Sequence, residues 1–531
     1  MIYNHDEIIA SLSIMFEKLN DQTRKKLLGE EIERIINSYF GRISADQLAT
    51  SLLSKYGSDL FNKKYGVFET IINGSEREDL ISLAISLGLN TDSKTIWDDI
   101  LCKLDSKRNL SIFLKNYNLP DYFLMIGKKD LRETTETIKL EYNQSLTSLG
   151  FPHSYQNFVK LELIEKINNS SGKFSSLVVM PTGSGKTRTA VEYMIDFIRE
   201  KKKANIIWVV DSPELAEQAL QTFKSLWLLR GDRELTIHRC FNKFNPTINF
   251  EKKINIIFCA FDKLRSEKEK TSNLFNGLKL NTNLLLIDEA HYSLATKYDE
   301  ILSSIKNNSK ELITIGLTAT PLRPDDNEMF SLKNYFDNRI IEFKDEDDII
   351  IKNPLEYLQE KNYLASIDVE YLSIPSDEIK PTSSEFNTKI INRIKQSLEE
   401  KKQIIIFAMS KNHAIALDIL LKHEKVKCNC IIGETLSQER QIYFKEFQDK
   451  KINVLINYDI LATGIDLPKV DELFILRKFG QVTTAMQVLG RALRGELNGG
   501  NKKNKIISVI NNKVIINNPN DLYNLINNMH T

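Results

Sequence analysis

The segment Met180-Pro181-Thr182-Gly183-Ser184-Gly185-Lys186-Thr187 constrains the fold of this chain more than any other part of the sequence. It directly follows the apolar run Leu177-Val178-Val179, and apolar residues then recur at helical spacing from Ala190 to Ile198. Glycine at positions 183 and 185 lets the backbone wrap closely around a polyphosphate with its N–H groups pointing inward. A strand, a glycine-rich loop and a helix in this order predict an α/β fold with a phosphate site at a strand end.

The charged and hydroxyl residues of this loop suit a nucleotide. Lys186 can neutralise the outer phosphates, and Thr187 can ligate Mg²⁺. Met180 stands where the strict pattern has a glycine, so the loop alone also fits a glycine-rich turn without a ligand. The strand before the loop and the helix after it favour the phosphate site.

A second motif lies further along the chain, where Leu284-Leu285-Leu286-Ile287 leads into Asp288-Glu289-Ala290-His291. The apolar run predicts a buried strand that ends in paired carboxylates. Asp288 can hold Mg²⁺ through water, and Glu289 can orient an attacking water. An acidic pair at a strand end is often a solvated turn, but a phosphate loop upstream favours catalysis.

Together with Gly316-Leu317-Thr318-Ala319-Thr320-Pro321, the motif Asp288-Glu289-Ala290-His291 resembles those of the superfamily 2 helicases and translocases. The resemblance covers roughly residues 150 to 510, and the motifs come in the family's order. It implies two RecA-like domains, each a parallel sheet flanked by helices, with ATP and Mg²⁺ bound in the cleft between them. Within Phe151-Pro152-His153-Ser154-Tyr155-Gln156, the glutamine is implied to read the adenine.

A buried strand of the second lobe is predicted at Gln403-Ile404-Ile405-Ile406-Phe407-Ala408. Further on lie Thr463-Gly464-Ile465-Asp466-Leu467-Pro468 and Gln487-Val488-Leu489-Gly490-Arg491-Ala492-Leu493-Arg494-Gly495. Arg491 and Arg494 are spaced i and i+3, so on a helix they share one face and can point together at a phosphate. Two arginines on a helix can also be a solvated face, but the resemblance implies arginine fingers that the second lobe supplies to ATP on the first.

The resemblance assigns a role to each matching residue. The residues implied to act in catalysis are Lys186, Asp288, Glu289, His291, Arg491 and Arg494. Those implied to bind the nucleotide are Gln156, Thr182, Gly183, Ser184, Gly185, Lys186, Thr187, Gly464, Asp466 and Gln487, and the metal ligands are Thr187 and Asp288. Those implied to contact nucleic acid, or to couple it to the nucleotide, are Ser212, Thr318, Thr320, Ser410 and Thr463. Pro213 stands where many relatives carry an arginine that contacts a phosphate.

Two motifs bear on the branch of the superfamily. Thr318-Ala319-Thr320-Pro321 and Gly490-Arg491-Ala492-Leu493-Arg494 resemble the motor subunits of type I and type III restriction enzymes and related repair translocases more than DEAD-box RNA helicases. The resemblance therefore implies DNA as the substrate, in antiviral defence, restriction or repair. RNA is one alternative, and an ATP-switched sensor that recruits an effector without unwinding is another.

The sequence divides into three predicted regions. Residues 1–140 show short amphipathic helices and no recognisable chemistry, residues 141–348 form the ATP-binding domain, and residues 349–531 form the C-terminal helicase domain. We expect the first region to be an all-α accessory domain that docks a protein partner or packs on the first lobe. Since no nuclease motif stands out, the expected partner is a separately encoded nuclease or effector.

Composition excludes several other classes. Lys plus Arg number 72 against 71 Asp plus Glu, so any nucleic-acid groove has to be a local patch. No apolar run approaches the roughly 20 residues that span a bilayer. The five cysteines lack Cys-x-x-Cys spacing, which fits a reducing cytoplasm and predicts no zinc or iron–sulfur site.

Overall fold

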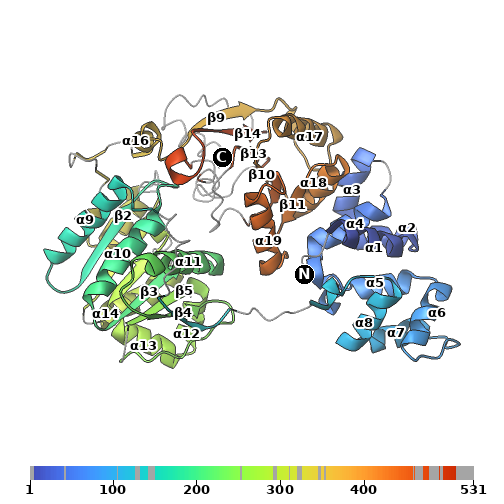
Figure 1. Cartoon of the computed structure of the whole chain (residues 1–531), viewed down its shortest axis with the longest axis horizontal. Coiled ribbons are helices and arrows are strands. Elements are labelled where there is room, and N and C mark those ends of the chain that lie inside the picture. The colour runs from blue at the N-terminus through green and yellow to red at the C-terminus, as the bar shows by residue number, and fades with distance from the viewer. Residues whose placement is uncertain are drawn as a thin grey trace.

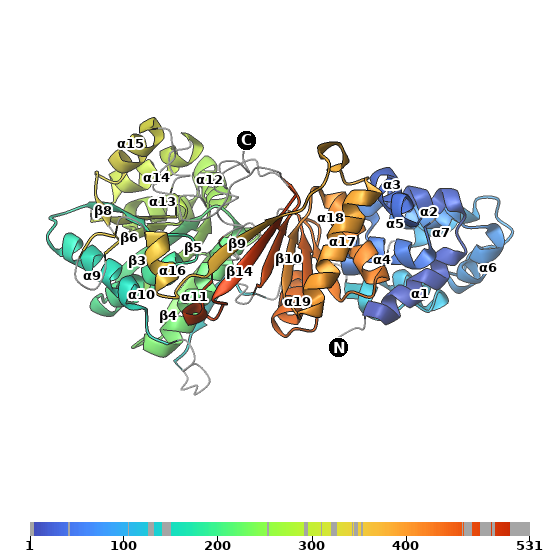
Figure 2. The ribbon, with the colours of Figure 1, turned by 90° about the horizontal axis from the view of Figure 1, so that it is seen from above.

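The computed structural model describes residues 5–40, 43–104, 106–125, 132–140, 150–251, 254–290, 296–309, 311–319, 326–341, 343–344, 349–351, 354–458, 460, 470–477, 490 and 494–509. Three parts of the chain lie in a row: a first α/β lobe, a second α/β lobe and a helical N-terminal domain (Figures 1 and 2). The second lobe lies in the middle. None of the helices in these ranges combines the length and apolar character needed to cross a membrane.

Short amphipathic helices build the N-terminal domain. Their bounds are α1 (His5–Glu17), α2 (Asp21–Leu28), α3 (Glu30–Phe40), α4 (Ala45–Tyr56), α5 (Val67–Gly74), α6 (Arg77–Ser86), α7 (Ile96–Lys103) and α8 (Lys107–Asn116), with the short 3₁₀ turns η1 (Gly57–Asp59), η2 (Lys63–Tyr65) and η3 (Asp121–Met125). In α3 the buried residues Ile32, Ile35 and Ile36 recur at helical spacing and form one apolar face. This confirms the predicted all-α region.

The first lobe contains an eight-stranded sheet. Its order is β1 (Thr135–Ile138), β4 (Leu235–Cys240), β5 (Ile254–Ala260), β3 (Ala204–Val210), β6 (Leu284–Ile287), β7 (Ile313–Thr318), β2 (Phe174–Val179) and β8 (Ile340–Ile341). Every pairing is parallel except that of β1 with β4. The helices that flank it are α9 (Ser154–Asn168), α10 (Lys186–Glu200), α11 (Pro213–Arg230), α12 (Phe261–Glu269), α13 (Asn273–Asn281), α14 (Thr296–Asn308) and α15 (Asp326–Tyr335).

Both faces of this sheet are buried, which explains the unbroken apolar runs in the sequence. Along β3, Ile206 and Trp208 belong to an apolar cluster shared with α9, α10 and α11. Ile207 and Val209 belong to a second cluster shared with α12 to α15. A strand buried on both faces has no polar side to alternate with, as is usual in parallel α/β sheets.

The second lobe contains a six-stranded, fully parallel sheet. Its order is β11 (Cys428–Ile431), β12 (Val454–Asn457), β10 (Ile404–Phe407), β13 (Glu472–Ile475), β14 (Lys503–Ser508) and β9 (Ser366–Tyr371). Its helices are α17 (Ser384–Glu399), α18 (Lys411–His423) and α19 (Ser437–Gln448), and α16 (Pro354–Glu360) lies on the connection from the first lobe. The predicted pair of parallel sheets flanked by helices is confirmed.

The boundary between the first two regions differs from the one expected from sequence. Residues 135–138 fall in the region predicted to be helical, but they form β1, which pairs with β4 so that Thr135 lies opposite His238. Only Ile138 of this strand is buried. This segment therefore belongs to the sheet of the first lobe.

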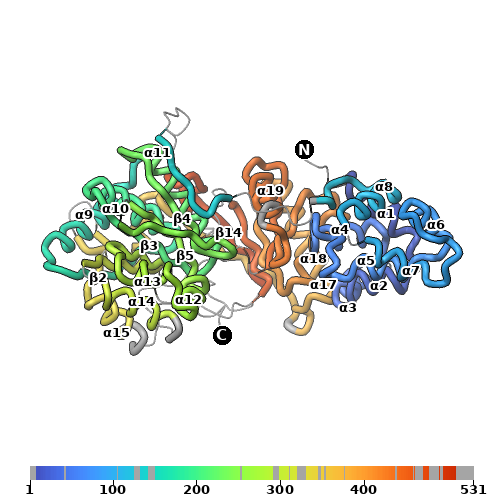
Figure 3. Tube along the Cα trace, turned by 90° about the horizontal axis from the view of Figure 1, so that it is seen from below, coloured from blue at the N-terminus to red at the C-terminus, as the bar shows by residue number. Residues whose placement is uncertain are grey.

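The N-terminal domain packs on the second lobe and not, as the sequence analysis allowed, on the first (Figure 3). Helices α3 and α4 contact α18, and one apolar cluster continues from these helices into the second sheet. Polar contacts cross the same boundary: Ser54 Oγ donates to Asp418 Oδ2 at 2.6 Å, and the Tyr122 hydroxyl donates to the Glu439 carboxylate. The helical domain and the second lobe thus form one body with a shared core.

Candidate nucleotide site between the lobes

Three neighbouring strands of the first sheet carry the predicted motifs at their carboxyl ends. The strand β7 lies between β6 and β2, and all three run parallel. The phosphate loop follows β2, the acidic pair follows β6, and Thr318 ends β7. In an open parallel sheet, ligands bind at this edge.

The phosphate loop has the backbone conformation that its glycines allow. Gly183 has φ +83° and Gly185 has φ +84°, both in the left-handed region that residues with a Cβ rarely adopt. Ser184 closes the turn, because its Oγ donates to Pro181 O at 2.7 Å. Since α10 begins at Lys186, the positive end of its dipole points at the loop.

One hydroxyl in this loop fits a bound anion. Thr182 Oγ1 is buried and has no hydrogen-bond partner among the described residues. A buried polar atom without a partner costs about 1–3 kcal/mol, so a ligand that accepts from it would recover this energy. Phosphate oxygens are such acceptors, and the loop therefore fits a nucleotide. Met180 is fully buried in an apolar cluster that includes residues of both lobes.

The acidic pair lies against the phosphate loop. The Thr187 hydroxyl hydrogen bonds to the Asp288 carboxylate, and the charge of Lys186 acts on the same group. Burial, followed by repulsion from Glu289, raises the pKa of Asp288 in spite of these contacts. The two predicted metal ligands are thus neighbours, and a divalent cation between them would favour the ionised carboxylate.

The backbone of Glu289 is strained. Its φ of +50° lies in the left-handed region, which costs a non-glycine residue about 1–3 kcal/mol. Its N–H donates to Asp288 Oδ1 at 3.0 Å, and Asp288 N–H donates to Val209 O at 2.9 Å. These bonds fix the turn at the end of β6, where strain is typical of a functional site.

Gln156 and Thr318 contact the phosphate loop from neighbouring elements. The Gln156 amide accepts from His153 N at 3.0 Å and donates to Ser184 O at 2.9 Å, and the side chain is only 2% exposed. Met180 N donates to Thr318 O at 3.1 Å. Both predicted residues are therefore linked to the loop, and adenine recognition by Gln156 stays a prediction.

The second lobe reaches this loop through the segment that carries the predicted arginines. A Cβ added at Gly490 would collide with the methyl group of Thr182, so the backbone at Gly490 lies directly against the Thr182 side chain. Arg494 lies further along, in a β-bridge with Leu364, and burial lowers the pKa of its guanidinium to about 10. The predicted phosphate loop and this arginine segment therefore lie together across the lobe boundary.

Other predicted residues lie elsewhere. Ser212 and Ser410 cap α11 and α18, where their Oγ atoms accept from Leu215 N at 3.3 Å and His413 N at 3.1 Å. Both helix starts are polar ends able to contact a phosphate backbone, and their role stays a prediction. The predicted residues that lie outside the described ones are His291, Thr320, Thr463, Gly464, Asp466, Gln487 and Arg491.

Sequence reasoning missed the contacts that join the lobes. Glu214 in α11 and Arg440 in α19 form an ion pair at 3.6 Å. His153 contacts Asn498 beside the connecting segment. His153 lies in a motif that the sequence analysis quoted, but its partner lies 345 residues away and gives no local signal.

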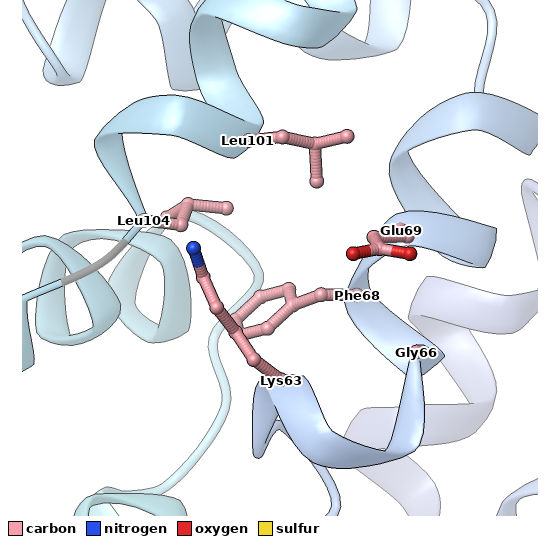
Figure 4. Close-up of a pocket in the computed structure, with 6 residues that line it drawn as sticks. All are labelled: Lys63, Gly66, Phe68, Glu69, Leu101 and Leu104. Carbon is pink, nitrogen blue, oxygen red and sulfur yellow. The ribbon is translucent and has the colours of Figure 1, made fainter.

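A small cavity in the N-terminal domain is a poor candidate for the nucleotide site. It is lined by Lys63, Gly66, Phe68, Glu69, Leu101 and Leu104, and its volume is about 30 Å³ (Figure 4). This volume is about that of one water molecule in the liquid. A nucleotide does not fit there.

Two protein-family models match this chain. Residues 151–323 match the family described as type III restriction enzyme, res subunit (ResIII), and residues 386–496 match the helicase conserved C-terminal domain. IRC3 of Saccharomyces cerevisiae, named as an ATP-dependent helicase, is 26% identical over 341 residues, which are 60% of this chain and 46% of that protein.

A bacterial relative and a solved structure cover more of the chain. The type I restriction enzyme EcoKI endonuclease subunit of Escherichia coli is 23% identical over 443 residues, which are 73% of this chain and 36% of that protein. The chain thus spans less than half the length of these two relatives. The type ISP restriction-modification enzyme LlaBIII, solved bound to DNA, has the same fold over 73% of this chain and 30% of its own, with a TM-score of 0.50 and 14% identity. The two predicted RecA-like lobes are confirmed.

Proposed function

The chain belongs to the ResIII-like branch of the superfamily 2 helicases, and from this premise we propose that it couples ATP hydrolysis to movement along DNA. The observation that best supports this proposal is the meeting of the two lobes at the phosphate loop. Thr182 lies in that loop, its hydroxyl has no hydrogen-bond partner in the described part of the chain, and Gly490 of the arginine segment packs on its methyl group. Because both lobes contribute to this site, nucleotide binding and release change the position of one lobe relative to the other.

On this proposal, the first lobe binds and activates the nucleotide. The backbone N–H groups of the loop around Gly183 and Gly185 hold the phosphates, and Lys186 neutralises their charge. Thr187 and Asp288 hold Mg²⁺, which screens the charge that develops on the phosphates. Glu289, held by its turn beside Asp288, orients the attacking water.

The second lobe supplies charge to the same reaction. Arg494 and its neighbour Arg491 stabilise the negative charge on the phosphates as it shifts in the transition state. Because that contribution is largest in the transition state, these arginines act on rate more than on nucleotide affinity. Closure and opening of the lobes then move the grip of Ser212 and Ser410 along the strand, and the buried Thr318 couples the cleft to that grip.

Support for DNA, and for a role in defence, restriction or repair, comes from the motifs and from the relatives. The matched ResIII family is described as a restriction-enzyme subunit, and one relative is named as the endonuclease subunit of a type I restriction enzyme. We propose that the nuclease or effector is a separate polypeptide. The N-terminal domain, which lies at the far end of the second lobe, leaves its outer helices open to such a partner (Figure 2).

Steady-state ATPase activity tests the substrate. The purified chain is assayed alone and with single-stranded DNA, duplex DNA or RNA, beside Lys186→Ala. We expect DNA to stimulate turnover and RNA not to, with no turnover in the variant. Stimulation by RNA alone would overturn the assignment to DNA, and equal turnover by Lys186→Ala would overturn the assignment of the phosphate loop.

A further inference from the structure

Side chains from three distant segments meet where the lobes join. His153 and Tyr155 lie at the start of α9, Tyr363 lies in the connection between the lobes, and Asn498 lies in the turn η7 (Glu496–Asn498) after Arg494. The ring of His153 lies 4.5 Å from that of Tyr363, and the ring of Tyr155 lies 4.9 Å from it. His153 Nε2 lies 2.8 Å from Asn498 Oδ1.

The hydrogen bonds of Asn498 fix the direction of each contact. Its Nδ2 donates to Tyr363 O at 2.7 Å, so its Oδ1 is the acceptor that faces His153. His153 Nε2 therefore carries the proton and donates it to this contact. Burial lowers the pKa of His153, so the imidazole is neutral at physiological pH. One asparagine thus holds the connecting segment and the first lobe at the same time.

This cluster is linked on one side to the phosphate loop. The Tyr155 hydroxyl donates to Ser184 O at 2.7 Å, and the side chain is 1% exposed. Ser184 is the central residue between the two glycines whose backbone shapes the loop. Movement of the aromatic cluster would therefore be transmitted to the loop.

On the other side, the cluster is linked to the arginine segment. Arg494 forms a β-bridge with Leu364, and Gly495 N donates to Tyr363 O at 3.2 Å. A Cβ at Gly495 would collide with the backbone of the connecting segment, so only glycine allows this approach. The connecting segment therefore sets the position of Arg494. Asn498 bonds both to this segment and to His153.

We propose that His153, Tyr363 and Asn498 form an inter-lobe latch that positions Arg494 at the phosphate loop. This inference rests on the proposed ATPase function, because it assigns these residues to the geometry of that site. They act as positioning residues, since their contacts are to the connecting segment, to one another and to Tyr155, whose hydroxyl bonds to Ser184 O. The His153–Asn498 bond joins the two lobes directly, so it exists only while the lobes are together.

Kinetics of single and double variants test the latch. Asn498→Ala and His153→Ala each remove the shared bond, and we expect kcat for ATP to fall about fivefold to tenfold with KM and ADP affinity unchanged. The double variant should lose less than the two single losses combined, because each single variant already removes the His153–Asn498 bond. His153→Gln, whose amide can donate in place of Nε2, should restore part of the rate.

Asn501→Ala is the matched control. Asn501 lies just after the same turn, but its side chain bonds only to Val470, Asp471 and Asn504 of the second lobe among the described residues. We expect it to keep the wild-type kcat. Equal losses in Asn501→Ala and Asn498→Ala, or additive losses in the double variant, would overturn the latch.

A second measurement does not depend on activity. Dyes are attached at Lys270→Cys in the first lobe and Glu399→Cys in the second, in a Cys102→Ser background, because the other four cysteines are buried. Without nucleotide, Asn498→Ala should shift the energy-transfer distribution towards open lobes, and Asn501→Ala should not. Identical distributions for Asn498→Ala and the unsubstituted protein would overturn the latch. If Asn498→Ala shifts the distribution towards open lobes but no nucleic acid stimulates ATP hydrolysis, the latch is supported. The proposed coupling of hydrolysis to movement along DNA is then contradicted.

Discussion

Glu289 is the residue whose local geometry says most about its role. Its left-handed backbone, at φ +50°, is held by a bond from its own N–H to Asp288, and Asp288 in turn contacts Thr187. A backbone fixed in this way beside the phosphate loop supports the proposed role of the Glu289 side chain in orienting a water. The strain is tolerated because the surrounding strands determine the turn.

Replacing Glu289 by glutamine should separate binding from turnover. The side chain keeps its size, but it can no longer take up a proton, and loss of a general base typically lowers the rate at least about 100-fold. We expect kcat to fall by this factor while ADP still binds. The control is Glu269→Gln, which changes an exposed residue of the same lobe. Turnover by Glu289→Gln at the wild-type rate would contradict the assigned role.

His413 makes stability depend on pH. It is fully buried, its Nδ1 accepts from Met409 N at 3.2 Å, and Asn387 Oδ1 accepts from its Nε2 at 3.0 Å. Burial lowers its pKa to about 3. Since this value lies below the unfolded value of 6.5, its contribution to stability is complete above pH 6.5 and is lost as the pH falls from 6.5 towards 3.

The measurement compares urea unfolding of the unsubstituted protein and His413→Gln at pH 7.5 and pH 5.0. Glutamine can keep the donor to Asn387 but does not titrate. We expect the unsubstituted protein to lose about 2 kcal/mol more than the variant between these pH values. Equal losses in both proteins would show that His413 titrates near its ordinary pKa.

At the scale of elements, the main finding is the junction between η1, η3 and α19. Ser58 N donates to Glu439 Oε1 at 2.9 Å, and the Tyr122 hydroxyl donates to the same oxygen. Burial raises the pKa of Glu439. A buried carboxylate needs these donors, so the helical domain and the second lobe stabilise each other.

Tyr122→Phe should therefore weaken this junction. Removing one donor from a buried carboxylate costs about 1–3 kcal/mol, and the loss should appear in the free energy of unfolding of the second lobe together with the helical domain. Tyr65→Phe, a change within the helical domain, is the control and should stay within about 0.5 kcal/mol. If unfolding of the second lobe is unchanged in Tyr122→Phe, the two parts are not coupled through this contact.

The elements show why part of the structure was predictable. Apolar runs such as Leu284–Ile287 and Ile404–Phe407 are typical of strands buried on both faces. The phosphate loop follows a strand directly, so it also indicated at which end of the first sheet the ligand site lies. Strand β1 was missed because three of its four residues are not buried, so it lacks an apolar pattern. The positions of Asn498 and the N-terminal domain were missed because amphipathic faces and single polar residues do not specify which distant surface they contact.

At the scale of the whole molecule, the N-terminal domain moves with the second lobe. One apolar cluster contains Leu12, Phe61 and Phe113 of the helical domain as well as Ile406 and Leu420 of the second lobe. Because α3 and α4 pack directly on α18 within this cluster, we expect the domain and the second lobe to stay together when the lobes open. Any partner bound to the outer helices would therefore be carried with the second lobe during the ATP cycle.

Deleting residues 1–125 should consequently damage the second lobe itself. The apolar surface around α18 and β11 would become exposed to water, and exposed patches of this kind promote aggregation. We expect the truncated chain to elute as aggregates in size-exclusion chromatography, while the full chain with Lys186→Ala elutes as the unsubstituted protein does. A monodisperse truncation with full ATPase activity would contradict the shared core.

Displacement of a triplex-forming oligonucleotide from duplex DNA most directly tests the claim that ATP hydrolysis drives movement. The oligonucleotide is placed at increasing distances from the DNA end, and its release is followed after ATP is added. The account predicts a delay that grows linearly with distance, and no release by Lys186→Ala. DNA-stimulated ATP hydrolysis without displacement at any distance would contradict it, and would leave an ATP-switched clamp that holds DNA without moving along it.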